Sequence, residues 1–498
     1  MSDHRYDAIV VGAGIGGLSS AIALAAEGMT VCVVEAADAA GGKMGWASVD
    51  GVECDTGPSV LTLPNVFEDV FAAAGIRMAD VLTLRRPDPS FRYLFADGAQ
   101  VEIHHAPVDT LDSVRRSLGA DAARELEGFM AYSRGIWEAA APVFVYGDAP
   151  NMATVLSAGT QLFNGLTKVD AMSQMWPAIK KRVSDPHLRK ILARYATYNG
   201  SDVRCAPATL NCIAHVELGL GGYGVEGGMY QLVRALVAAA KKVGVTFRFG
   251  MAVSALRLEK KLFGERVVGV TLEEGTHLAA PRVVANADVA HVVEALLPAH
   301  VRHGIPVTET PSMSGYNGIL RARRRTGADR RAAHTVLFPH DYEAEFADIF
   351  DRDRPPAEPT VYLCAQEVCH GRTGWEHEEP VFVMANAPAE PRRGHRDEEI
   401  YTSLRERTLQ RMRSAGLCDD DDRLAWERTP KQLAARFRGS RGSIYGAASN
   451  NQTAAFQRPS NRVSKVKGLF LASGSAHPGG GVPLAALSGR AAARAALA

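Results

Sequence analysis

The N-terminal part of the chain carries two short apolar runs, separated by a glycine turn and an alanine-rich stretch. Ala8–Val11 has the length and the β-branched character of a buried strand, and residues 30–34 form a second run of the same kind. Between them, residues 18–27 are apolar and rich in alanine, with Gly28 placed to end a helix. Strand, helix and strand in this order predict a βαβ unit with two parallel strands.

A period of two residues appears further along the chain. Phe91, Tyr93 and Phe95 alternate with other side chains, and Val101 and Ile103 do the same after a short turn. This alternation predicts a hairpin in an antiparallel sheet. Further strands are predicted at residues 245–249, 253–258, 267–271, 277–284, 334–338, 361–364 and 381–385, and helices at 64–74, 110–118, 121–139, 230–242 and 397–414. The arginine-rich stretch 321–331 is predicted to be a solvated loop.

Residues 162–198 combine apolar side chains, Trp176 among them, with many cations. The cations are Lys168, Lys180, Lys181, Arg182, Arg189, Lys190 and Arg194. A basic amphipathic segment with a tryptophan is typical of a helix that lies in a membrane surface. A helix with its apolar face on the protein core and its basic face in water has the same pattern. The sequence leaves both interpretations open.

Composition and charge exclude several classes of protein. Apolar residues make up 46% and charged residues 22% of the chain, as in ordinary soluble proteins, and a net charge of +1 gives no field for binding nucleic acid. The length of 498 residues predicts two or three domains. The first strand begins too early for a signal peptide, and no apolar run is long enough to span a bilayer. Seven cysteines without a CxxC pair predict reduced thiols in a cytoplasm and no structural zinc.

The turn after the first strand, Gly12-Ala13-Gly14-Ile15-Gly16-Gly17, contains the GxGxxG pattern of dinucleotide-binding domains. Gly12 allows a sharp turn, Gly14 lets a pyrophosphate approach the backbone, and Gly17 lets the helix pack closely. The N-terminus of the helix offers free N–H groups to the phosphates. Glu35, which follows the second strand, is placed to accept ribose hydroxyls and to repel a 2′-phosphate. The motif in this context predicts bound NAD or FAD.

A second glycine turn, Ala39-Ala40-Gly41-Gly42-Lys43, follows the acid and ends in a cation. It resembles the GG-Arg/Lys signature of the flavin amine oxidase and carotenoid desaturase superfamily, in which the turn passes the pyrophosphate and the cation lies near the flavin. The resemblance favours FAD over NAD, because a plain NAD domain does not need this turn. The alternative is a surface loop with a solvated lysine.

Three further elements resemble bacterial phytoene-desaturase-like carotenoid desaturases. Asp55-Thr56-Gly57-Pro58-Ser59 is similar to the D-x-G-P-[ST] element that runs beside the isoalloxazine ring, although Asp55 and Pro58 fit plain turn chemistry equally well. Val253 stands at the start of a predicted strand, where the superfamily pairs its backbone with adenine. Asn286-Ala287-Asp288 resembles the N-A-D turn at the nucleotide.

The C-terminal region carries a second strong resemblance. His477-Pro478-Gly479-Gly480-Gly481-Val482-Pro483 is similar to the H-P-G-G-G-[IV]-P signature of the same family and leads into an alanine-rich helix. A glycine loop at a helix N-terminus suits an anionic ligand, here the pyrimidine edge of the flavin. Ser475 follows Gly474 where many flavin amine oxidases have an aspartate, so no aspartate contact is expected. His477 is a candidate base, and the alternative is a histidine that holds a turn.

The motifs and the resemblance together predict a set of FAD-binding residues. They are Gly12, Gly14, Gly17, Glu35, Gly42, Lys43, Gly57, Pro58, Ser59, Val253, Asn286, Gly474, Gly481, Val482 and Pro483. A second GxGxxG at residues 219–224 is not expected to bind a nucleotide, because no convincing β-branched strand precedes it and no ribose-binding acid follows it.

The resemblance covers essentially the whole chain and implies an α/β fold, α+β overall. It implies a Rossmann-like FAD-binding domain of the flavin amine oxidase and glutathione reductase type, interleaved with a substrate domain that contains an antiparallel sheet and helices. The predicted FAD-binding domain is discontinuous and comprises residues 1–75, 220–290 and 455–498. The predicted substrate-binding and membrane-contacting domain comprises residues 76–219 and 291–454.

Within this family the chain most resembles the 1-hydroxycarotenoid 3,4-desaturases, through residues 57–71, 139–146 and 334–351. The resemblance implies C3–C4 desaturation of a 1-hydroxy- or 1-methoxycarotenoid by hydride transfer to FAD. It also implies oxygen or a quinone as electron acceptor, and peripheral contact with the cytoplasmic membrane.

Three alternatives stay open at this point. They are a phytoene desaturase or another carotenoid desaturase or isomerase of the same family, a flavin amine oxidase, and a lipid carrier like the Rab GDP-dissociation inhibitors. A carrier should have lost its flavin motifs, and this chain retains them. The sequence shows no catalytic dyad or triad, and neither a metal site nor a nucleic-acid partner is predicted.

Overall fold

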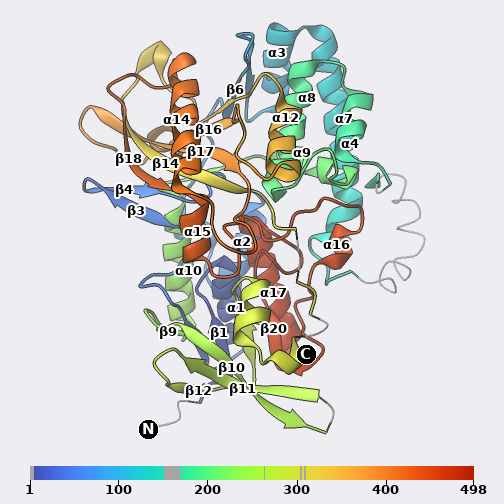
Figure 1. Cartoon of the computed structure of the whole chain (residues 1–498), viewed down its shortest axis with the longest axis vertical. Helices are drawn as coiled ribbons and strands as arrows, with labels where there is room; N and C mark the ends of the chain where they lie inside the picture. The colour runs from blue at the N-terminus through green and yellow to red at the C-terminus, as the bar shows by residue number, and fades with distance from the viewer. Residues whose placement is uncertain (1–4, 151–168, 171, 263, 303–304, 308–309) are drawn as a thin grey trace.

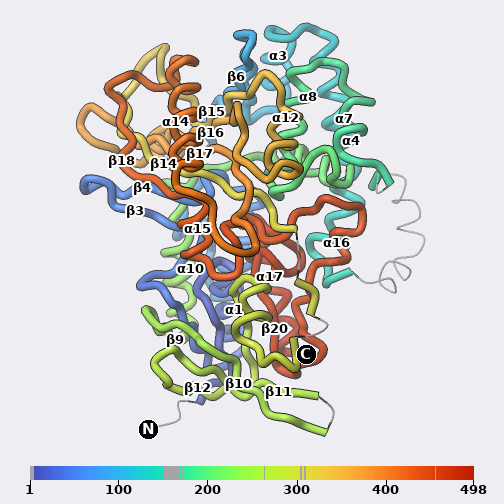
Figure 2. The backbone as a smooth tube through the Cα atoms, viewed as in Figure 1, coloured from blue at the N-terminus to red at the C-terminus, as the bar shows by residue number. Residues whose placement is uncertain are grey.

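The computed structural model describes residues 5–150, 169–170, 172–262, 264–302, 305–307 and 310–498. The molecule is elongated, with one large sheet towards each end (Figure 1). The chain passes between the two ends several times, so that each end is built from segments far apart in sequence (Figure 2). Among the described residues, no helix is both long enough and apolar enough to cross a bilayer.

The lower sheet in Figure 1 has five parallel strands. Their order is β20 (Leu469–Leu471), β13 (Val283–Ala285), β1 (Ala8–Val11), β2 (Val31–Val34) and β9 (Thr246–Arg248). The register places Val11 beside Val34 and Ala285, and Ala285 beside Leu471. Because parallel strands end on the same side, the residues that follow β1, β2, β13 and β20 meet at one edge of the sheet.

Each face of this sheet is covered by a different layer. Ala8 and Val10 of β1 pack against helices, whereas Ile9 and Val11 pack against a second sheet. The helices are α1 (Ile15–Ala26), α2 (Pro64–Ala73), α10 (Tyr230–Lys242) and α17 (Val482–Leu497). The second sheet consists of β10 (Val253–Lys261), β11 (Gly264–Leu272) and β12 (His277–Ala279), and β19 (Val466–Lys467) pairs with β11.

The predicted βαβ unit is confirmed, and one predicted strand is wrong in its extent. The strand expected over residues 277–284 is two strands, β12 and β13, which belong to different sheets. Pro281 lies in the break between them. A proline has no N–H to donate to a sheet ladder, so the break falls where the chain changes sheets.

The upper sheet has seven strands. Their order is β18 (Arg423–Arg428), β14 (Ser314–Arg323), β17 (Glu378–Ala387), β16 (Val361–Ala365), β15 (His334–Leu337), β6 (Phe91–Leu94) and β7 (Gln100–Ile103). Neighbouring strands are antiparallel except β15 and β6, which run parallel. The expected antiparallel sheet is therefore mixed at this one pair, where the first and second passes of the chain through this end meet.

Helices cover one side of the upper sheet. They are α3 (Pro107–Leu118), α4 (Ala120–Phe144), α7 (Met175–Arg182), α8 (Pro186–Ala193), α9 (Cys212–Leu218) and α12 (Tyr342–Phe346). The 3₁₀ segment η2 (Arg194–Asn199) follows α8 directly. Helix α14 (Glu398–Ser414) contacts strands β14 and β16 of the same sheet. Strand and helix side chains from Phe91 to Ile349 form one apolar core.

The basic segment belongs to this core as far as the structure describes it; residues 162–168 lie outside the described residues. Met175, Trp176 and Ile179 are buried in the core of the upper half. Lys180 lies over the Trp176 ring and pairs with Glu343. Of the two interpretations that the sequence left open, the structure favours packing of the apolar face on the core.

The stretch 321–331 is only in part the solvated loop that its charge predicts, since residues 326–330 are exposed but the residues on either side are not free in solvent. Its first residues end strand β14, and Arg331 is nearly buried against the Glu379 carboxylate. Arg324 donates hydrogen bonds to Glu367 and to three backbone carbonyl groups. Acidic partners distant in sequence bury these cations, and a local charge count cannot detect such partners.

Candidate functional site

A cavity of about 920 Å³ opens at the carboxyl edge of the five-stranded sheet and extends towards the seven-stranded sheet. The residues that follow four of the parallel strands line it: Gly12, Glu35, Asn286 and Ser473. Of the fifteen predicted FAD-binding residues, all but Gly17 line this cavity. Glycine motifs separated by more than four hundred positions in sequence are thus brought to one place.

The first glycine turn places the N-terminus of α1 at the cavity. Gly12 has φ +98°, which favours glycine, and Gly14 caps the helix without a side chain. The Glu35 carboxylate accepts hydrogen bonds from the backbone N–H of Ala13 at 2.6 Å and of Ala37 at 2.9 Å. An ionised carboxylate can accept about four hydrogen bonds, so capacity for ribose hydroxyls is left.

Gly17 does not line the cavity, and its contribution is to packing. A Cβ atom at Gly17 would lie 2.0 Å from the carbonyl oxygen of Gly12. The absence of a side chain therefore lets the first turn of α1 fold back on the preceding loop. The structure thus separates Gly17 from the glycines that leave room for a ligand.

The C-terminal loop brings a second helix N-terminus to the same cavity. Gly481 caps α17 at φ +115° without a side chain, and Val482 and Pro483 form the first turn. Helices α1 and α17 pack side by side, so closely that a Cβ at Gly489 would lie 2.1 Å from the Gly16 carbonyl oxygen. Two helix N-termini directed at one cavity give it a positive potential suited to a pyrophosphate.

Lys43 joins the second glycine turn to a distant loop. Its Nζ donates hydrogen bonds to the carbonyl oxygens of Ser443 at 2.8 Å and Ile444 at 3.1 Å. Burial lowers the pKa of Lys43, and the Asp288 carboxylate acts in the opposite direction. A buried amine at the cavity wall excludes the alternative of a solvated lysine on a surface loop.

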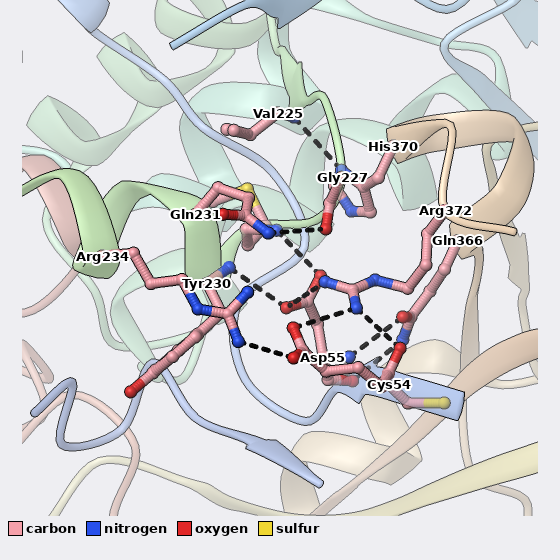
Figure 3. A network of polar contacts seen from close by, with 12 residues as sticks. Cys54, Asp55, Val225, Gly227, Tyr230, Gln231, Arg234, Gln366, His370 and Arg372 are labelled. Carbon is pink, nitrogen blue, oxygen red and sulfur yellow. Dashed lines mark hydrogen bonds and ion pairs between the residues drawn. The ribbon is translucent and has the colours of Figure 1, made fainter. Parts of the chain in front are cut away.

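The D-x-G-P-S element divides into two parts with different positions. Gly57, Pro58 and Ser59 line the cavity, whereas Asp55 is buried beside it (Figure 3). Asp55 accepts hydrogen bonds from the backbone N–H of Met229 at 2.8 Å and of Tyr230 at 3.1 Å, which lie at the start of α10.

Two side chains from the upper half complete the Asp55 contacts. Arg372 lies 3.4 Å from the Asp55 carboxylate, and the Gln366 side chain bonds both backbone polar groups of Asp55 (Figure 3). Asp55 therefore satisfies free N–H groups of α10 and joins that helix to the other end of the molecule. Of the two interpretations left open for Asp55, the structure favours the structural one.

Asn286 connects the glycine turn to the C-terminal strand. Its backbone N–H donates to Val11 O at 2.8 Å, and its side-chain amide donates to Ala472 O. A Cβ at Gly14 would lie 2.7 Å from Asn286 Oδ1, so the side chain lies directly against the turn. Val253, at the start of β10, lines the cavity on the side of Glu35 and Ala252.

His477 lines the cavity, but both its backbone and its ring are already engaged. Its Nε2 lies 3.0 Å from Gly147 O, and its backbone groups pair with Pro459 O and with the Asn461 side chain. Burial lowers the pKa of His477, so the ring is neutral and Nε2 carries the proton donated to Gly147. This geometry favours a histidine that holds a turn. Nearby, Ser475 Oγ accepts from Val289 N–H at 2.9 Å.

The upper part of the cavity contains apolar side chains and a buried polar cluster. The cluster consists of Tyr93, Arg194, Tyr195, Tyr198 and Glu217, and we call it the arginine–tyrosine cluster. Arg194 donates to the hydroxyls of Tyr93 at 3.0 Å and Tyr198 at 2.9 Å, and Tyr195 and Tyr198 donate to the Glu217 carboxylate. Arg194, Tyr198 and Glu217 line the cavity. A buried cation and a buried anion are thereby paired and hydrogen-bonded.

Tyr342 lies beside this cluster and lines the cavity. Among the described residues, its buried hydroxyl makes no hydrogen bond of good geometry, although the Thr360 side chain lies near enough to act on its pKa. Burial raises the pKa of Tyr342 well above its ordinary value, so the hydroxyl stays protonated and can donate. Buried polar groups are rarely left without a partner, which marks this hydroxyl as a candidate contact for a ligand.

Sequence reasoning missed Arg194, Tyr342 and Arg458 as residues of the site. Arg458 is buried at the cavity, donates to Ala447 O at 3.1 Å and Asn199 Oδ1 at 3.2 Å, and has its pKa lowered by burial to about 10. The Arg458-Pro459-Ser460-Asn461 segment was the available signal, since it resembles the family. Its partners come from other parts of the chain, so the burial of this cation could not be inferred.

Comparison with known proteins agrees with this geometry. The model of the family of flavin-containing amine oxidoreductases matches residues 15–360. A hydroxyneurosporene desaturase of Rubrivivax gelatinosus is 34% identical, over 98% of this chain and 92% of that protein. A 4,4′-diapolycopene oxygenase of Methylomonas sp. is 30% identical, over 98% of this chain and 97% of that protein. A solved oxidoreductase of Methanosarcina mazei has the same fold, with a TM-score of 0.63 at 14% identity over 98% of this chain and 99% of that one.

The chain therefore belongs to the family of flavin-containing amine oxidoreductases and, within it, to the bacterial carotenoid desaturases. It is an FAD-dependent oxidoreductase with an α/β FAD-binding fold, as the sequence predicts. The residues present fit the cofactor, because side-chain-free helix N-termini, a carboxylate with free acceptor capacity and a half-buried amine meet at one cavity.

Proposed function

We propose that this protein is a carotenoid desaturase that introduces the C3–C4 double bond into a 1-hydroxy- or 1-methoxycarotenoid. The observation that carries the proposal is the single cavity that runs from the two glycine loops to an apolar compartment in the upper half. The hydroxyneurosporene desaturase among the relatives supports the choice of substrate. This compartment can hold a long polyene with one end next to the cofactor, deep inside the protein.

The proposed FAD site uses the residues that the sequence singled out. Gly14, Gly481 and Val482 supply N–H groups for the pyrophosphate, Gly12 forms the turn with its own N–H bonded to Val34 O, and Glu35 accepts from the ribose. Gly42, Lys43, Gly57, Pro58, Ser59, Val253, Asn286, Gly474 and Pro483 surround the remainder, and Gly17 acts through packing. We also propose the division into an FAD-binding domain (1–75, 220–290, 455–498) and a substrate domain (76–219, 291–454).

Bound FAD supplies a hydride acceptor next to an allylic carbon. The residues of this chain hold the polyene in place and exclude water from it. Loss of a hydride would leave a positive charge that the polyene spreads along its length, so that a weak base or a single water molecule would suffice to take a proton from the neighbouring carbon. This chemistry is consistent with His477 being held in a turn rather than free to act as a base.

Tyr342 and the arginine–tyrosine cluster, which lie in the upper part of the cavity, are proposed to select the substrate. Val336, Phe382 and other apolar side chains line the route, and Tyr342 and the arginine–tyrosine cluster lie along it. The unpartnered Tyr342 hydroxyl can donate to the tertiary hydroxyl or the methoxy oxygen of the carotenoid. An unsubstituted carotenoid would leave this hydroxyl buried without a partner, which disfavours its binding.

Incubation with single carotenoids tests this proposal. Purified holoprotein with membranes is supplied separately with phytoene, neurosporene and 1-hydroxyneurosporene, and the products are separated and weighed by mass spectrometry. The proposal predicts a red-shifted product that lacks two hydrogen atoms, formed from 1-hydroxyneurosporene alone. Conversion of phytoene would replace the substrate proposal by another desaturase activity. Addition of an oxygen atom would place the protein with the oxygenases to which it is also similar.

The electron acceptor and the cellular location belong to the same proposal. Oxygen or a quinone would reoxidise the flavin, and hydrogen peroxide formation distinguishes the two.

We propose peripheral attachment to the cytoplasmic membrane at the edge of the cavity where Phe144 and Phe456 meet, with Phe456 42% exposed. Co-sedimentation with lipid vesicles tests this contact, which Phe456→Ser should weaken.

A further inference from the structure

Three side chains with metal-binding atoms converge behind the cavity wall. His334 Nε2, Cys364 Sγ and Cys369 Sγ all lie within 4.8 Å of one another, and all three residues are buried. The distance between His334 Nε2 and Cys369 Sγ is 3.4 Å. We call these residues the His–Cys–Cys cluster.

The fold explains why these residues meet. His334 and Cys364 are direct partners across the antiparallel pair β15–β16. The chain leaves β16 and enters the short helix α13 (Gln366–His370), which returns Cys369 over the strand end. The three ligand atoms therefore come from the two neighbouring strands and the helix, and do not depend on a flexible loop.

The hydrogen bonds around the cluster leave the correct atoms available to a metal. His334 Nδ1 lies 2.9 Å from the Tyr362 hydroxyl, and in the tautomer in which Nδ1–H donates to that oxygen the lone pair of Nε2 faces Cys369 Sγ. A histidine ligand typically has its other ring nitrogen held in this way. The imidazole of His334 also lies against Phe91 and Tyr362, which restrict its orientation.

His370 supports the cluster without joining it. Its Nδ1 accepts the backbone N–H of Val225 at 3.2 Å, so Nε2 carries the proton (Figure 3). That Nε2 lies 3.8 Å from Cys364 Sγ and can donate to it. A hydrogen bond of this kind stabilises a thiolate, which is the form of cysteine that binds metals.

We propose that His334, Cys364 and Cys369 bind one zinc-type divalent cation. Zinc takes nitrogen and sulfur ligands at bond lengths of about 2.0 to 2.3 Å, which separates tetrahedral ligand atoms by roughly 3.5 to 3.8 Å. The His334 Nε2–Cys369 Sγ distance of 3.4 Å is close to this separation, and the other ligand atoms lie within 4.8 Å of one another. Two thiolates and a neutral imidazole leave the metal one further coordination position.

The position of the site suggests a role in shaping the cavity. Tyr362, which holds His334, lines the cavity, and so does Ser59, whose carbonyl oxygen lies 3.9 Å from Cys369 Sγ. A bound cation would fix β15, β16 and α13 together behind these two wall residues. The lack of a CxxC pair favoured the absence of a structural zinc, but the ligands of this site are gathered by strand pairing rather than by local spacing.

Metal analysis of the full-length holoprotein tests the proposal. The protein is equilibrated with Zn²⁺ under reducing conditions, passed over a desalting column and measured by mass spectrometry of the elements. We expect about one zinc per chain in the wild type, and background levels in Cys364→Ser, Cys369→Ser and His334→Gln. Cys418→Ser is the matched control, because Cys418 is also buried and free but lies in another core cluster, and it should keep the zinc.

Cobalt substitution in the wild-type protein provides a readout that is independent of how the variants fold. Co²⁺ in the wild-type protein should give the thiolate-to-metal charge-transfer absorption and the intense visible bands of a tetrahedral site. Absence of stoichiometric zinc together with absence of these bands would overturn the proposal. Two other results would overturn it as well. One is a Cys364–Cys369 disulfide that is found in protein purified without reductant and persists after reduction and metal addition. The other is full zinc retention in Cys364→Ser.

Discussion

At the scale of single residues, the Tyr342 hydroxyl is a buried polar group at the substrate end of the cavity that makes no hydrogen bond of good geometry among the described residues. Tyr342→Phe removes only this hydroxyl and keeps the ring that packs on Phe338 and Phe346. We expect kcat/KM for 1-hydroxyneurosporene to fall roughly two- to tenfold, the value of one hydrogen bond, while turnover of any unsubstituted carotenoid stays equal or rises.

Tyr316→Phe is the matched control for this substitution. Tyr316 is equally buried, but its hydroxyl bonds Glu427 at 2.8 Å and it does not line the cavity. Its loss should lower stability without altering the preference between substrates. Equal losses for both carotenoids in Tyr342→Phe would show that the hydroxyl does not recognise the end group.

A second residue-scale effect concerns pH. Burial raises the pKa of Glu345 from 4.5 to about 7, even though Thr360 and Asn386 donate hydrogen bonds to its carboxylate. Because the folded state holds the proton more tightly than the unfolded state, the stability from this group is present below pH 4.5 and is lost as the pH rises towards 7. The loss amounts to about 3 kcal/mol, from about 1.4 kcal/mol for each pKa unit.

Urea unfolding of the wild type and Glu345→Gln across this pH range measures the effect. The difference in unfolding free energy between the two proteins should shift by about 3 kcal/mol in favour of the variant as the pH rises from 4.5 to 7. Parallel stability curves would show that Glu345 is ionised in the folded protein throughout.

At the scale of elements, the start of α10 depends on a residue outside that helix. Asp55 bonds the N–H groups of Met229 and Tyr230 and pairs with the buried Arg372. Asp55→Asn removes the charge and leaves Arg372 with weaker compensation, so we expect a destabilisation of about 3 kcal/mol. Thermal unfolding of the holoprotein measures it.

Asp69→Asn is the control for this prediction, because it removes an exposed partner of Arg490, in a pair worth less than about 1 kcal/mol. Destabilisation of Asp55→Asn no greater than that of the control would show that Asp55 does not anchor α10. Loss of the N-terminal contacts should also loosen the neighbouring Gly57–Ser59 segment. Weaker retention of FAD by the Asp55 variant would reveal that loosening.

Elements with a strong local pattern could be predicted from the sequence, and contacts between distant elements could not. The βαβ unit around Gly12 and the helix over 230–242 follow from periodicity and glycine placement, which are local. The break between β12 and β13 was missed, although Pro281 marks it in the sequence, because a proline does not show that the two halves pair in different sheets.

The candidate site shows the same division. Residues in glycine motifs were identified because the motif itself encodes a backbone shape. The bonds from Lys43 to Ser443 and Ile444 cross four hundred positions, and the arginine–tyrosine cluster joins strand β6 to η2 and α9. Such contacts leave no signal in the local sequence, so Arg194, Tyr342 and Arg458 emerged only from the fold.

At the scale of the whole molecule, residues from both ends of the protein line one cavity. The lower end supplies the parallel sheet with its two helix N-termini, and the upper end supplies the apolar compartment. The chain crosses between them repeatedly, which fixes the cofactor side relative to the substrate side (Figure 2). This arrangement supports transfer of hydrogen from a long apolar substrate directly to the flavin.

A single-turnover experiment without oxygen tests whether hydrogen passes from the carotenoid directly to the flavin. The yellow holoprotein is mixed anaerobically with 1-hydroxyneurosporene in vesicles, and the visible flavin absorption and the carotenoid products are followed together. With direct transfer, we expect the flavin band to bleach as an equal amount of product lacking two hydrogen atoms appears. An unchanged flavin band, with product formed only after oxygen is admitted and carrying an added oxygen atom, would contradict it.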